Sequence, residues 1–239
     1  MRIAVLSDIH AMADALDAAL SAARREGFDR LMILGDLLTY GVAPEKTLAL
    51  VAESVERDGA MLVAGNHDQM YLGLTERQNS YFEQLPDWLR ETVEWTARRV
   101  SIEVLEDFAW QREWACGPLL MAHANPFAFG DWSYIANDAQ AEVAADALAA
   151  RGFAYGLFGH VHRYRRFPCE AACVFTVGSL GQPRDAQDRA LQWAMVDVED
   201  DVVTVTPRSV AFDRDAHIAS IRETSLSLAT QDRLCGFFA

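Results

Sequence analysis

The chain has 239 residues, a length that suits one domain, and 51% of them are hydrophobic, which is enough for a sizeable core. Its formal net charge of −14 disfavours nucleic acid and anionic membranes as partners. No apolar run approaches the roughly 20 residues of a membrane span, and the run that opens the chain reads as a buried strand, not a signal peptide. The four cysteines lack zinc-knuckle or disulfide-framework spacing, so we expect reduced thiols in a cytoplasmic protein, with a Cys169–Cys173 pair as the alternative.

The first third of the chain alternates apolar strands with amphipathic helices. Residues 2–7, 30–34 and 60–64 predict strands, and residues 11–25 and 44–57 predict the helices between them. This order is typical of a parallel sheet with crossover helices. A polar cluster follows each strand, and ligands of such sheets bind at the carboxyl ends of the strands.

The rest of the chain predicts a second set of elements. Residues 75–100 are expected to be helical and rich in aromatic side chains, as a cap or a packing layer, within a single domain that spans residues 1–239. A hairpin is expected over residues 108–122, followed by an alanine-rich helix over residues 136–150. Further strands are expected at 155–158, 173–177, 191–198 and 202–210, of which the last three look antiparallel.

Five of the six histidines stand in polar clusters at the ends of predicted strands, and only His217, in a predicted C-terminal helix, lies elsewhere. A single such histidine is usually structural, and an aspartate after a strand is usually a cap or a turn residue. Five clusters in one chain are not explained in that way. The clusters are Asp8-Ile9-His10, Gly35-Asp36, Gly65-Asn66-His67-Asp68, His123 and Gly159-His160-Val161-His162.

The spacing within these clusters suits metal binding. Residues two apart in an extended chain point to the same side, which applies to Asp8 and His10 and to His160 and His162. A glycine before Asp36, and another before Asn66, lets the backbone turn tightly near a bound ion. Imidazole, carboxylate and amide donors together suit manganese, iron or zinc better than calcium.

In this order the clusters resemble the calcineurin-like metallophosphoesterase superfamily, over about two thirds of the chain. The resemblance implies an α/β fold in which two β-sheets form a sandwich flanked by helices, in four αββα layers. Residues 178–185 are similar to a subgroup of small single-domain bacterial members, which includes phosphodiesterases and proteins named as diadenosine tetraphosphatases or protein phosphatases. Ala11-Met12 and Ala124 replace the family's usual Gly-Asn and Gly, at positions that are not ligands.

The resemblance also implies a role for each clustered residue. Asp8, His10 and His162 would hold the first of two metal ions, Asn66, His123 and His160 the second, and Asp36 would bridge them. The implied reaction is hydrolysis of a phosphodiester or nucleotide-type phosphate ester by a metal-bridging hydroxide. His67 would be the general acid, its ring oriented by Asp68, and the substrate would meet Asn66 and His67.

Three features outside the clusters allow two interpretations each. Arg184 either grips a phosphate of the substrate or pairs with Asp185 or Asp188. The basic run of residues 163–166 is either a solvated edge strand, which is the default, or a patch that faces a polyphosphate. The aromatic residues that follow His123 either pack in the core or a cap, which base rates favour, or stack on a nucleobase. They are Phe127, Phe129, Trp132 and Tyr134.

Two other functions compete with small-ester hydrolysis. A protein serine/threonine phosphatase would need an open groove for a peptide, which a sequence does not reveal. A non-catalytic scaffold of the same fold should lack ligands or the acid histidine, and this chain keeps all of them. A nuclease is disfavoured by the acidic charge, and self-association is left open.

Overall fold

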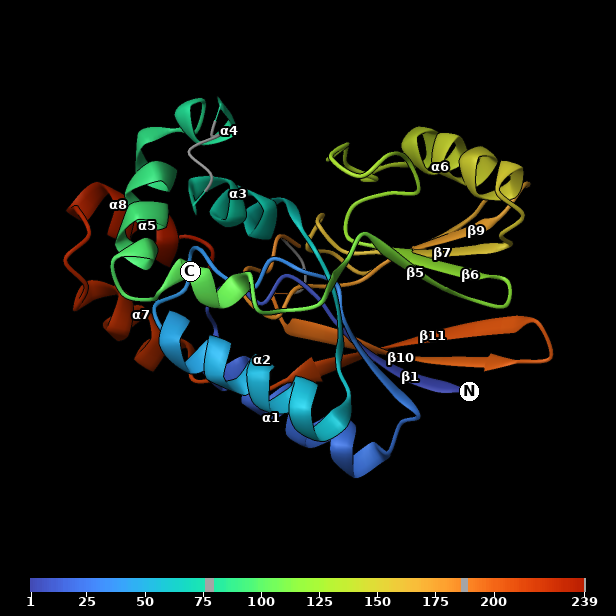
Figure 1. Ribbon diagram of the computed structural model, residues 1–239, viewed down its shortest axis with the longest axis horizontal. Coiled ribbons are helices and arrows are strands. Elements are labelled where there is room, and N and C mark those ends of the chain that lie inside the picture. The colour runs from blue at the N-terminus through green and yellow to red at the C-terminus, as the bar shows by residue number, and fades with distance from the viewer. Residues whose placement is uncertain (76–79, 186–188, 239) are drawn as a thin grey trace.

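The computed structural model describes residues 1–75, 80–185 and 189–238, and within them the strands form two sheets (Figure 1). The first sheet contains β1 (Arg2–Leu6), β2 (Arg30–Ile33), β3 (Met61–Val63), β4 (Trp110–Gln111), β10 (Leu191–Glu199) and β11 (Val202–Val210). The second contains β5 (Glu113–Cys116), β6 (Leu119–Ala122), β7 (Tyr155–Phe158), β8 (Arg165–Pro168) and β9 (Cys173–Thr176). Their orders are β11-β10-β1-β2-β3-β4 and β5-β6-β7-β9-β8.

Helices cover the outer faces of both sheets. Helices α1 (Ala13–Glu26) and α2 (Pro44–Asp58) lie on the first sheet, and α6 (Asp138–Ala150) lies on the second (Figure 1). At one end of the sandwich gather α3 (Asn66–Thr75), α4 (Ser80–Glu83), α5 (Asp87–Ala97), the 3₁₀ turn η1 (Ile102–Leu105), α7 (Arg214–Arg222) and α8 (Leu228–Cys235). The predicted four-layer αββα sandwich is confirmed.

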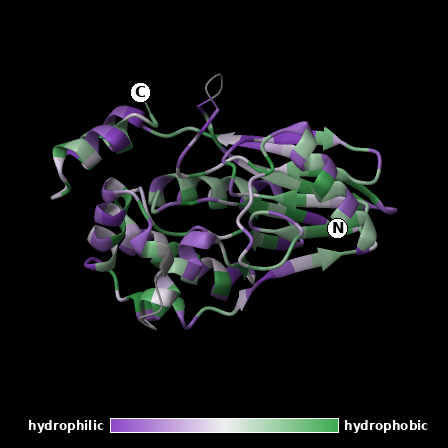
Figure 2. Cartoon of the chain, turned by 90° about the horizontal axis from the view of Figure 1, so that it is seen from above, coloured by the Kyte–Doolittle hydropathy of each residue, from purple (hydrophilic) through white to green (hydrophobic). Residues whose placement is uncertain are grey.

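Strand β1 shows why the layers form, because its side chains alternate between two cores. Ile3 and Val5 pack between the sheets, whereas Ala4 and Leu6 pack under the helices of the first face. All four are fully buried, and each large aliphatic side chain removed from water in this way contributes about 1.5–3 kcal/mol. Figure 2 shows the resulting concentration of hydrophobic residues along the strands.

Strand pairing corrects the sequence-based expectation in two places. Residues 113–122 do form an antiparallel hairpin, but Trp110–Gln111 pairs in parallel with β3 in the other sheet. The strand at 173–176 is antiparallel to β8 and parallel to β7, so it is not purely antiparallel as expected. Strands β10 and β11 pair antiparallel as predicted, through a turn in which Asp200 and Asp201 have φ values of 47° and 64°.

Helix boundaries also differ from the prediction. Helix α1 begins at Ala13 and not at Ala11, because His10 and Ala11 have φ values of 48° and 55°, outside the right-handed helical region. The predicted helical region at 75–100 is divided: Pro86 separates α4 from α5, and residues 76–79 lie outside the described part of the chain.

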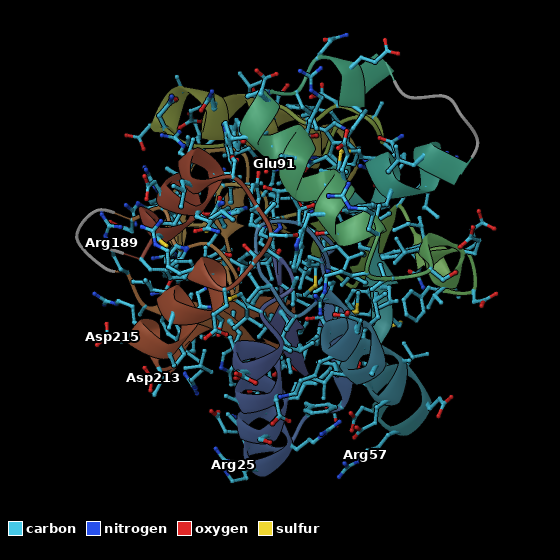
Figure 3. The ribbon with its side chains drawn as sticks, turned by 90° about the vertical axis from the view of Figure 1, so that its left-hand side faces the viewer. Arg25, Arg57, Glu91, Arg189, Asp213 and Asp215 are labelled. Atoms are coloured by element: carbon cyan, nitrogen blue, oxygen red, sulfur yellow. The ribbon has the colours of Figure 1, made fainter. Side chains whose placement is uncertain are left out.

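Of the two C-terminal helices, α8 packs against α5 and α7 packs against α8. The carboxylate of Glu91, which Figure 3 labels on α5, accepts hydrogen bonds from the backbone nitrogen of Ser227, at 2.6 Å, and from its hydroxyl, at 2.7 Å. Asp213 caps α7 by accepting from the nitrogen of Ala216 at 2.9 Å. No helix in the described ranges combines the length and the apolar character needed to cross a membrane. All four cysteines are free, so the alternative Cys169–Cys173 pair is not formed.

Candidate metal centre

Five of the clustered residues lie in loops whose backbone is held in a left-handed conformation at that residue. The φ values are 53° at Asp8, 48° at His10, 55° at Asp36, 64° at His160 and 59° at His162. Such values are uncommon outside glycine, and residues held in them concentrate at functional sites. Backbone hydrogen bonds tie the loops together, since the nitrogen of His10 donates to the oxygen of Asp36 at 2.9 Å.

Two glycines allow the loops to approach one another closely. A Cβ atom on Gly65 would overlap the carboxylate of Asp36 and would lie 2.8 Å from Cε1 of His123. A Cβ atom on Gly159 would overlap Ser7 and would lie 2.7 Å from Oδ2 of Asp8. Glycine at these positions therefore serves close packing around the carboxylates of the site.

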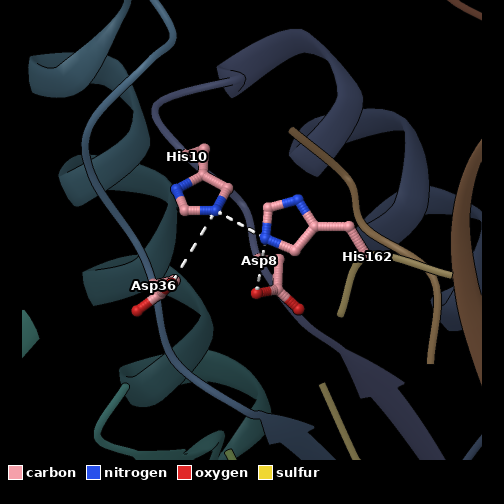
Figure 4. A group of neighbouring side chains, drawn as sticks. All are labelled: Asp8, His10, Asp36 and His162. Atoms are coloured by element: carbon pink, nitrogen blue, oxygen red, sulfur yellow. Dashed lines mark hydrogen bonds and ion pairs between the residues drawn. The ribbon is translucent and has the colours of Figure 1, made fainter. Parts of the chain in front are cut away.

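The first group of donors joins residues from three loops: Asp8, His10, Asp36 and His162, all buried (Figure 4). Their ligand atoms lie within 4.8 Å of one another. Nε2 of His162 lies 3.1 Å from Oδ1 of Asp8 and 3.2 Å from Nε2 of His10. Nε2 of His10 also lies 3.8 Å from Oδ2 of Asp36.

The hydrogen bonds of these two imidazoles show that the group fits a cation. Nδ1 of His10 lies 3.0 Å from the oxygen of Leu38, and Nδ1 of His162 lies 2.7 Å from the oxygen of Gln182. A carbonyl oxygen only accepts, so each Nδ1 carries the proton and each Nε2 of a neutral ring presents a lone pair. Two lone pairs that face each other at 3.2 Å repel, and a shared cation turns this arrangement into a favourable one.

The second group contains Asp36 again, with His123 and His160, and Asn66 lies beside it. Nε2 of His123 lies 3.1 Å from Oδ1 of Asn66 and 3.5 Å from Oδ2 of Asp36, while its Nδ1 faces the oxygen of Leu34 at 2.5 Å. His160 has the opposite orientation, because its Nε2 faces the oxygen of Trp132 at 2.9 Å, which leaves Nδ1 as the free donor. Asp36 is common to both groups, as a bridging ligand would be.

Burial and mutual repulsion keep most of these histidines neutral. Burial lowers the pKa of His10 well below its usual value, and it lowers the pKa of His160 to about 3, with repulsion from His123 adding to the effect. Burial raises the pKa of Asp36 to about 8, against the attraction of His123. Burial acts in the same direction on Asp8, but whenever the His162 ring is protonated, its charge and hydrogen bond outweigh burial and hold that pKa well below the usual range. Neutral imidazoles are ligands, and a bound cation would displace the Asp36 proton.

The surroundings of His67 differ from the expectation that Asp68 orients its ring. Asp68 accepts hydrogen bonds from the backbone nitrogens of Asp36, Leu37 and Gly65, at 2.7, 3.0 and 2.9 Å. The group on Nδ1 of His67 is instead Oγ1 of Thr39, at 2.9 Å. Asp68 therefore holds the loops that carry the site, because three converging backbone donors occupy its carboxylate.

Arg184 lies beside these groups, as the phosphate-gripping interpretation requires. Its Nε donates to Oε1 of Gln182 at 2.8 Å, and its Nη1 donates to Oη of Tyr134 at 3.3 Å. Its charge helps to lower the pKa values of both His67 and His162, after the larger effect of burial. Asp185 contacts Arg165 at 2.8 Å, and Asp188 lies outside the described residues.

The four aromatic residues after His123 differ in where they lie: some line the site, and others lie at the protein surface or against the core. Tyr134 stacks on His160 with ring centroids 4.3 Å apart and is 46% exposed. Trp132 packs edge-on against His123 and donates from Nε1 to Gln69. Phe129 is 37% exposed beside Trp132, and Phe127 is half-buried against the core under α6. Trp132 and Tyr134 thus line the site, whereas Phe127 packs in the core.

A cavity of about 350 Å³ opens over both groups of donors. Its polar side contains Asp36, Asn66, His67, His160, His162 and Arg184, and its other walls are Tyr40, Leu85, Pro86, Leu89, Trp132 and Tyr134. This volume lies in the range of small-molecule sites. His217 does not line this cavity but a different one, and it packs edge-on against Phe238, with ring centroids 4.6 Å apart.

Sequence reasoning missed several residues that support the site. Thr39 carried no signal, because a threonine in a loop is ordinary. Ser179 was available in the stretch of residues 178–185, and its hydroxyl donates to the oxygen of Asp8 at 2.8 Å. The carbonyl oxygen of Trp132, which orients His160, is a backbone group that residue identity does not reveal.

Comparison with known proteins places this site in a family. The profile of the calcineurin-like phosphoesterase superfamily domain matches residues 1–201. An uncharacterised protein of Methanocaldococcus jannaschii is 26% identical over 211 residues, which cover 79% of each chain. The crystal structure of a metallophosphoesterase from Sphaerobacter thermophilus has a TM-score of 0.75 at 25% identity and covers 99% of this chain and 100% of its own.

The fold extends to an archaeal protein as well. A hypothetical protein from Pyrococcus horikoshii has a TM-score of 0.80 at 18% identity, with 98% of this chain and 97% of its own covered. The profile match spans all the clustered residues, and the fold match spans nearly the whole chain. The chain therefore belongs to the calcineurin-like phosphoesterase superfamily and is a metal-dependent phosphoric ester hydrolase.

Proposed function

We propose that this protein hydrolyses phosphodiesters or nucleotide-type phosphate esters with two metal ions, and that His67 is the general acid. The observation that carries the proposal is the position of Asp36. Its Oδ2 lies 3.8 Å from Nε2 of His10 in one donor group and 3.5 Å from Nε2 of His123 in the other. Nε2 of His67 lies 4.0 Å from the same oxygen, so an acid–base group stands beside the shared carboxylate.

The donor set supports the ligand assignment made from the sequence. Asp8, His10 and His162 would hold one ion, Asn66, His123 and His160 would hold the other, and Asp36 would serve both. Mixed nitrogen and oxygen donors suit manganese, iron or zinc. Such ions, when bound, lower the pKa of water and neutralise the charge of the phosphate.

The side chains around the ions supply the remaining chemistry. His67 gives a proton to the leaving alkoxide from Nε2, the ring nitrogen that is not turned toward Thr39. Asn66 and Arg184 bind non-bridging phosphate oxygens, the arginine through its planar fork. Asp68 keeps the loops of Asp36 and Gly65 in register through its backbone contacts.

The cavity supports a small ester as the substrate. It is walled by the aromatic rings of Tyr40, Trp132 and Tyr134 and by apolar residues near the start of α5, which we propose as a cap within a single domain. The free state of the four cysteines supports a reducing compartment, and we propose the cytoplasm. A phosphoprotein substrate and a non-catalytic scaffold are outcomes that the following experiment distinguishes.

The test uses purified protein stripped of metal and reloaded with manganese. We expect hydrolysis of phosphodiesters with aryl leaving groups, and of nucleotide esters, to appear with metal and to disappear after chelation. Hydrolysis of phosphopeptides alone would favour a protein phosphatase. Binding of two ions without turnover of any ester would support a scaffold and overturn the proposal.

Leaving-group dependence tests the role of His67. In His67→Asn the turnover of esters with alkyl leaving groups should fall by roughly 10²–10⁴-fold, the usual contribution of general acid catalysis. Esters of p-nitrophenol need less protonation and should lose less. Equal losses on both, with metal content unchanged, would remove His67 from this role.

A further inference from the structure

A second cavity, of about 190 Å³, adjoins the first and shares two of its lining residues, Tyr134 and Arg184. The other residues that line it are Ile135, Ala136, Val161, Arg163 and Arg165. Three arginines thus converge on one small cavity in a chain of net charge −14. The other lining residues are mostly apolar. Apolar walls lower the local dielectric constant, so they strengthen the attraction between the guanidinium groups and an anion.

These arginines are attached to the metal centre through the backbone. Arg163 directly follows His162, and its Nε donates to the carbonyl oxygen of Arg184 at 2.7 Å. The backbone oxygen of Arg163 accepts from Oγ1 of Thr176 at 2.6 Å, which fixes the start of this segment against β9. Arg184 lines the first cavity as well as the second, so it stands at the junction of the two.

The charges of the three arginines are compensated to different degrees. Nη2 of Arg165 lies 2.8 Å from Oδ2 of Asp185, so its charge is partly neutralised. Arg163 has no carboxylate partner in residues 1–75, 80–185 and 189–238, and neither does Arg184, which contacts an amide and a phenol. Two guanidinium groups are therefore available for an anion at the junction of the two cavities.

We propose that the second cavity binds an additional phosphate group of the substrate, one phosphoanhydride or short linker away from the phosphate at the metal centre. The inference rests on the proposed function and makes its substrate class narrower: small esters that carry at least two phosphate groups. Arg163 binds the distal phosphate, and Arg184 stands between the distal phosphate and the one that is hydrolysed. Arg166 follows Arg165 in β8 but does not line the cavity, so it provides a matched control.

The experiment compares methylphosphonate with methylenediphosphonate, which offers one more phosphonate group and is not hydrolysed. Calorimetry on manganese-loaded protein gives the ratio of the two dissociation constants for wild type, Arg163→Gln and Arg166→Gln. We expect the diphosphonate to bind at least tenfold more tightly in wild type. The ratio should fall at least fivefold in Arg163→Gln and should stay at the wild-type value in Arg166→Gln.

The control separates the cavity from simple chelation, since a second phosphonate could also bind the metal ions in every variant. A wild-type ratio near one, or equal losses in the two variants, would overturn the inference. If a short oligothymidylate binds more tightly than the diphosphonate, and Arg163→Gln weakens that binding, the cavity serves a nucleic-acid strand. This result would also overturn the inference. Metal-dependent ester hydrolysis, measured separately, shows whether the proposed function stands when the inference fails.

Discussion

Oγ1 of Thr39 lies 2.9 Å from Nδ1 of His67, and the same hydroxyl lies 3.0 Å from Oη of Tyr71. Thr39 and Tyr71 are fully buried, so water does not compete for these contacts. The Thr39 hydroxyl donates to Tyr71, so its oxygen accepts from Nδ1–H of His67, which leaves Nε2 as the ring nitrogen that faces the leaving group. Burial lowers the pKa of His67 well below its usual value, so Nε2 would carry the proton for the leaving group only while the negative charge of a bound phosphate favours the imidazolium.

Thr39→Val tests this positioning role. The variant keeps the shape of the side chain but loses the hydroxyl, so both tautomers of His67 become available and kcat for alkyl esters should fall by about tenfold or more. Thr39→Ser should restore most of the activity. Esters of p-nitrophenol should be affected less, which a general loss of folding would not produce. A Val variant with wild-type kcat on alkyl esters would show that Thr39 has no such role.

Asp36→Asn should reduce binding at both metal positions. The carboxylate is shared by the two donor groups, and an amide supplies no negative charge to offset two cations. Elemental analysis after dialysis against manganese should give close to two ions per chain for wild type and well below one for the variant. Asp197→Asn, which removes an exposed carboxylate 3.7 Å from Arg2, should keep the wild-type content. Two retained ions in Asp36→Asn would contradict a shared ligand.

Gly65→Ala should damage the site through packing alone. The added Cβ would overlap the Asp36 carboxylate and press on the ring of His123, so we expect a loss of at least about 2 kcal/mol in the free energy of unfolding and weaker metal binding. Gly59→Ala is the control. Gly59 has a φ of 63° but open space around it, so backbone strain of about 1–2 kcal/mol should be the whole effect and metal content should not change. Chemical denaturation and metal analysis check both variants.

His217 should make the protein less stable in mild acid. Burial lowers its pKa from 6.5 to about 4, and its Nε2 is buried with no hydrogen-bond partner in the described chain. Between pH 6.5 and about 4 the unfolded chain takes up a proton that the folded chain does not, so the free energy of unfolding falls as the pH falls through this window. The full effect is at most about 3 kcal/mol.

This prediction is tested by comparing the pH dependence of stability in wild type and in His217→Leu. Denaturation curves of the metal-saturated variant should lose less stability between pH 7 and 5 than wild type, while the other histidines contribute equally to both. Parallel pH profiles for the two proteins would show that His217 stays at its unfolded pKa.

The Asp and His residues that the sequence singled out come together in the structure, because the signal that marks them is local. A polar cluster at the end of each apolar strand requires only that the strands share a sheet direction, and the parallel pairing of β1, β2 and β3 provides it. Amphipathic periodicity similarly placed α1, α2 and α6 within two residues of their observed ends, and the glycine after α1 marks where that helix stops.

What the sequence did not reveal depends on three-dimensional contacts. Asp68 is expected to hydrogen-bond the ring of His67, but its carboxylate accepts hydrogen bonds from three backbone nitrogens in two separate loops instead. Trp110 was expected in the hairpin, yet it pairs with Leu62 in the other sheet. Neither outcome follows from residue identity, because each depends on partners about 30 residues or more away in the sequence.

The segment that follows α8 contacts the pocket wall from beyond residues 1–201, the region that the family profile covers. Phe237, just after that helix, packs against Tyr40 and Trp88 with ring centroids 6.2 and 6.4 Å apart. The hydroxyl of Tyr40 lies 3.4 Å from Nε2 of His67. Homologous enzymes could thus diverge in substrate preference by exchanging residues of this distant helix and its neighbours while every ligand stays the same.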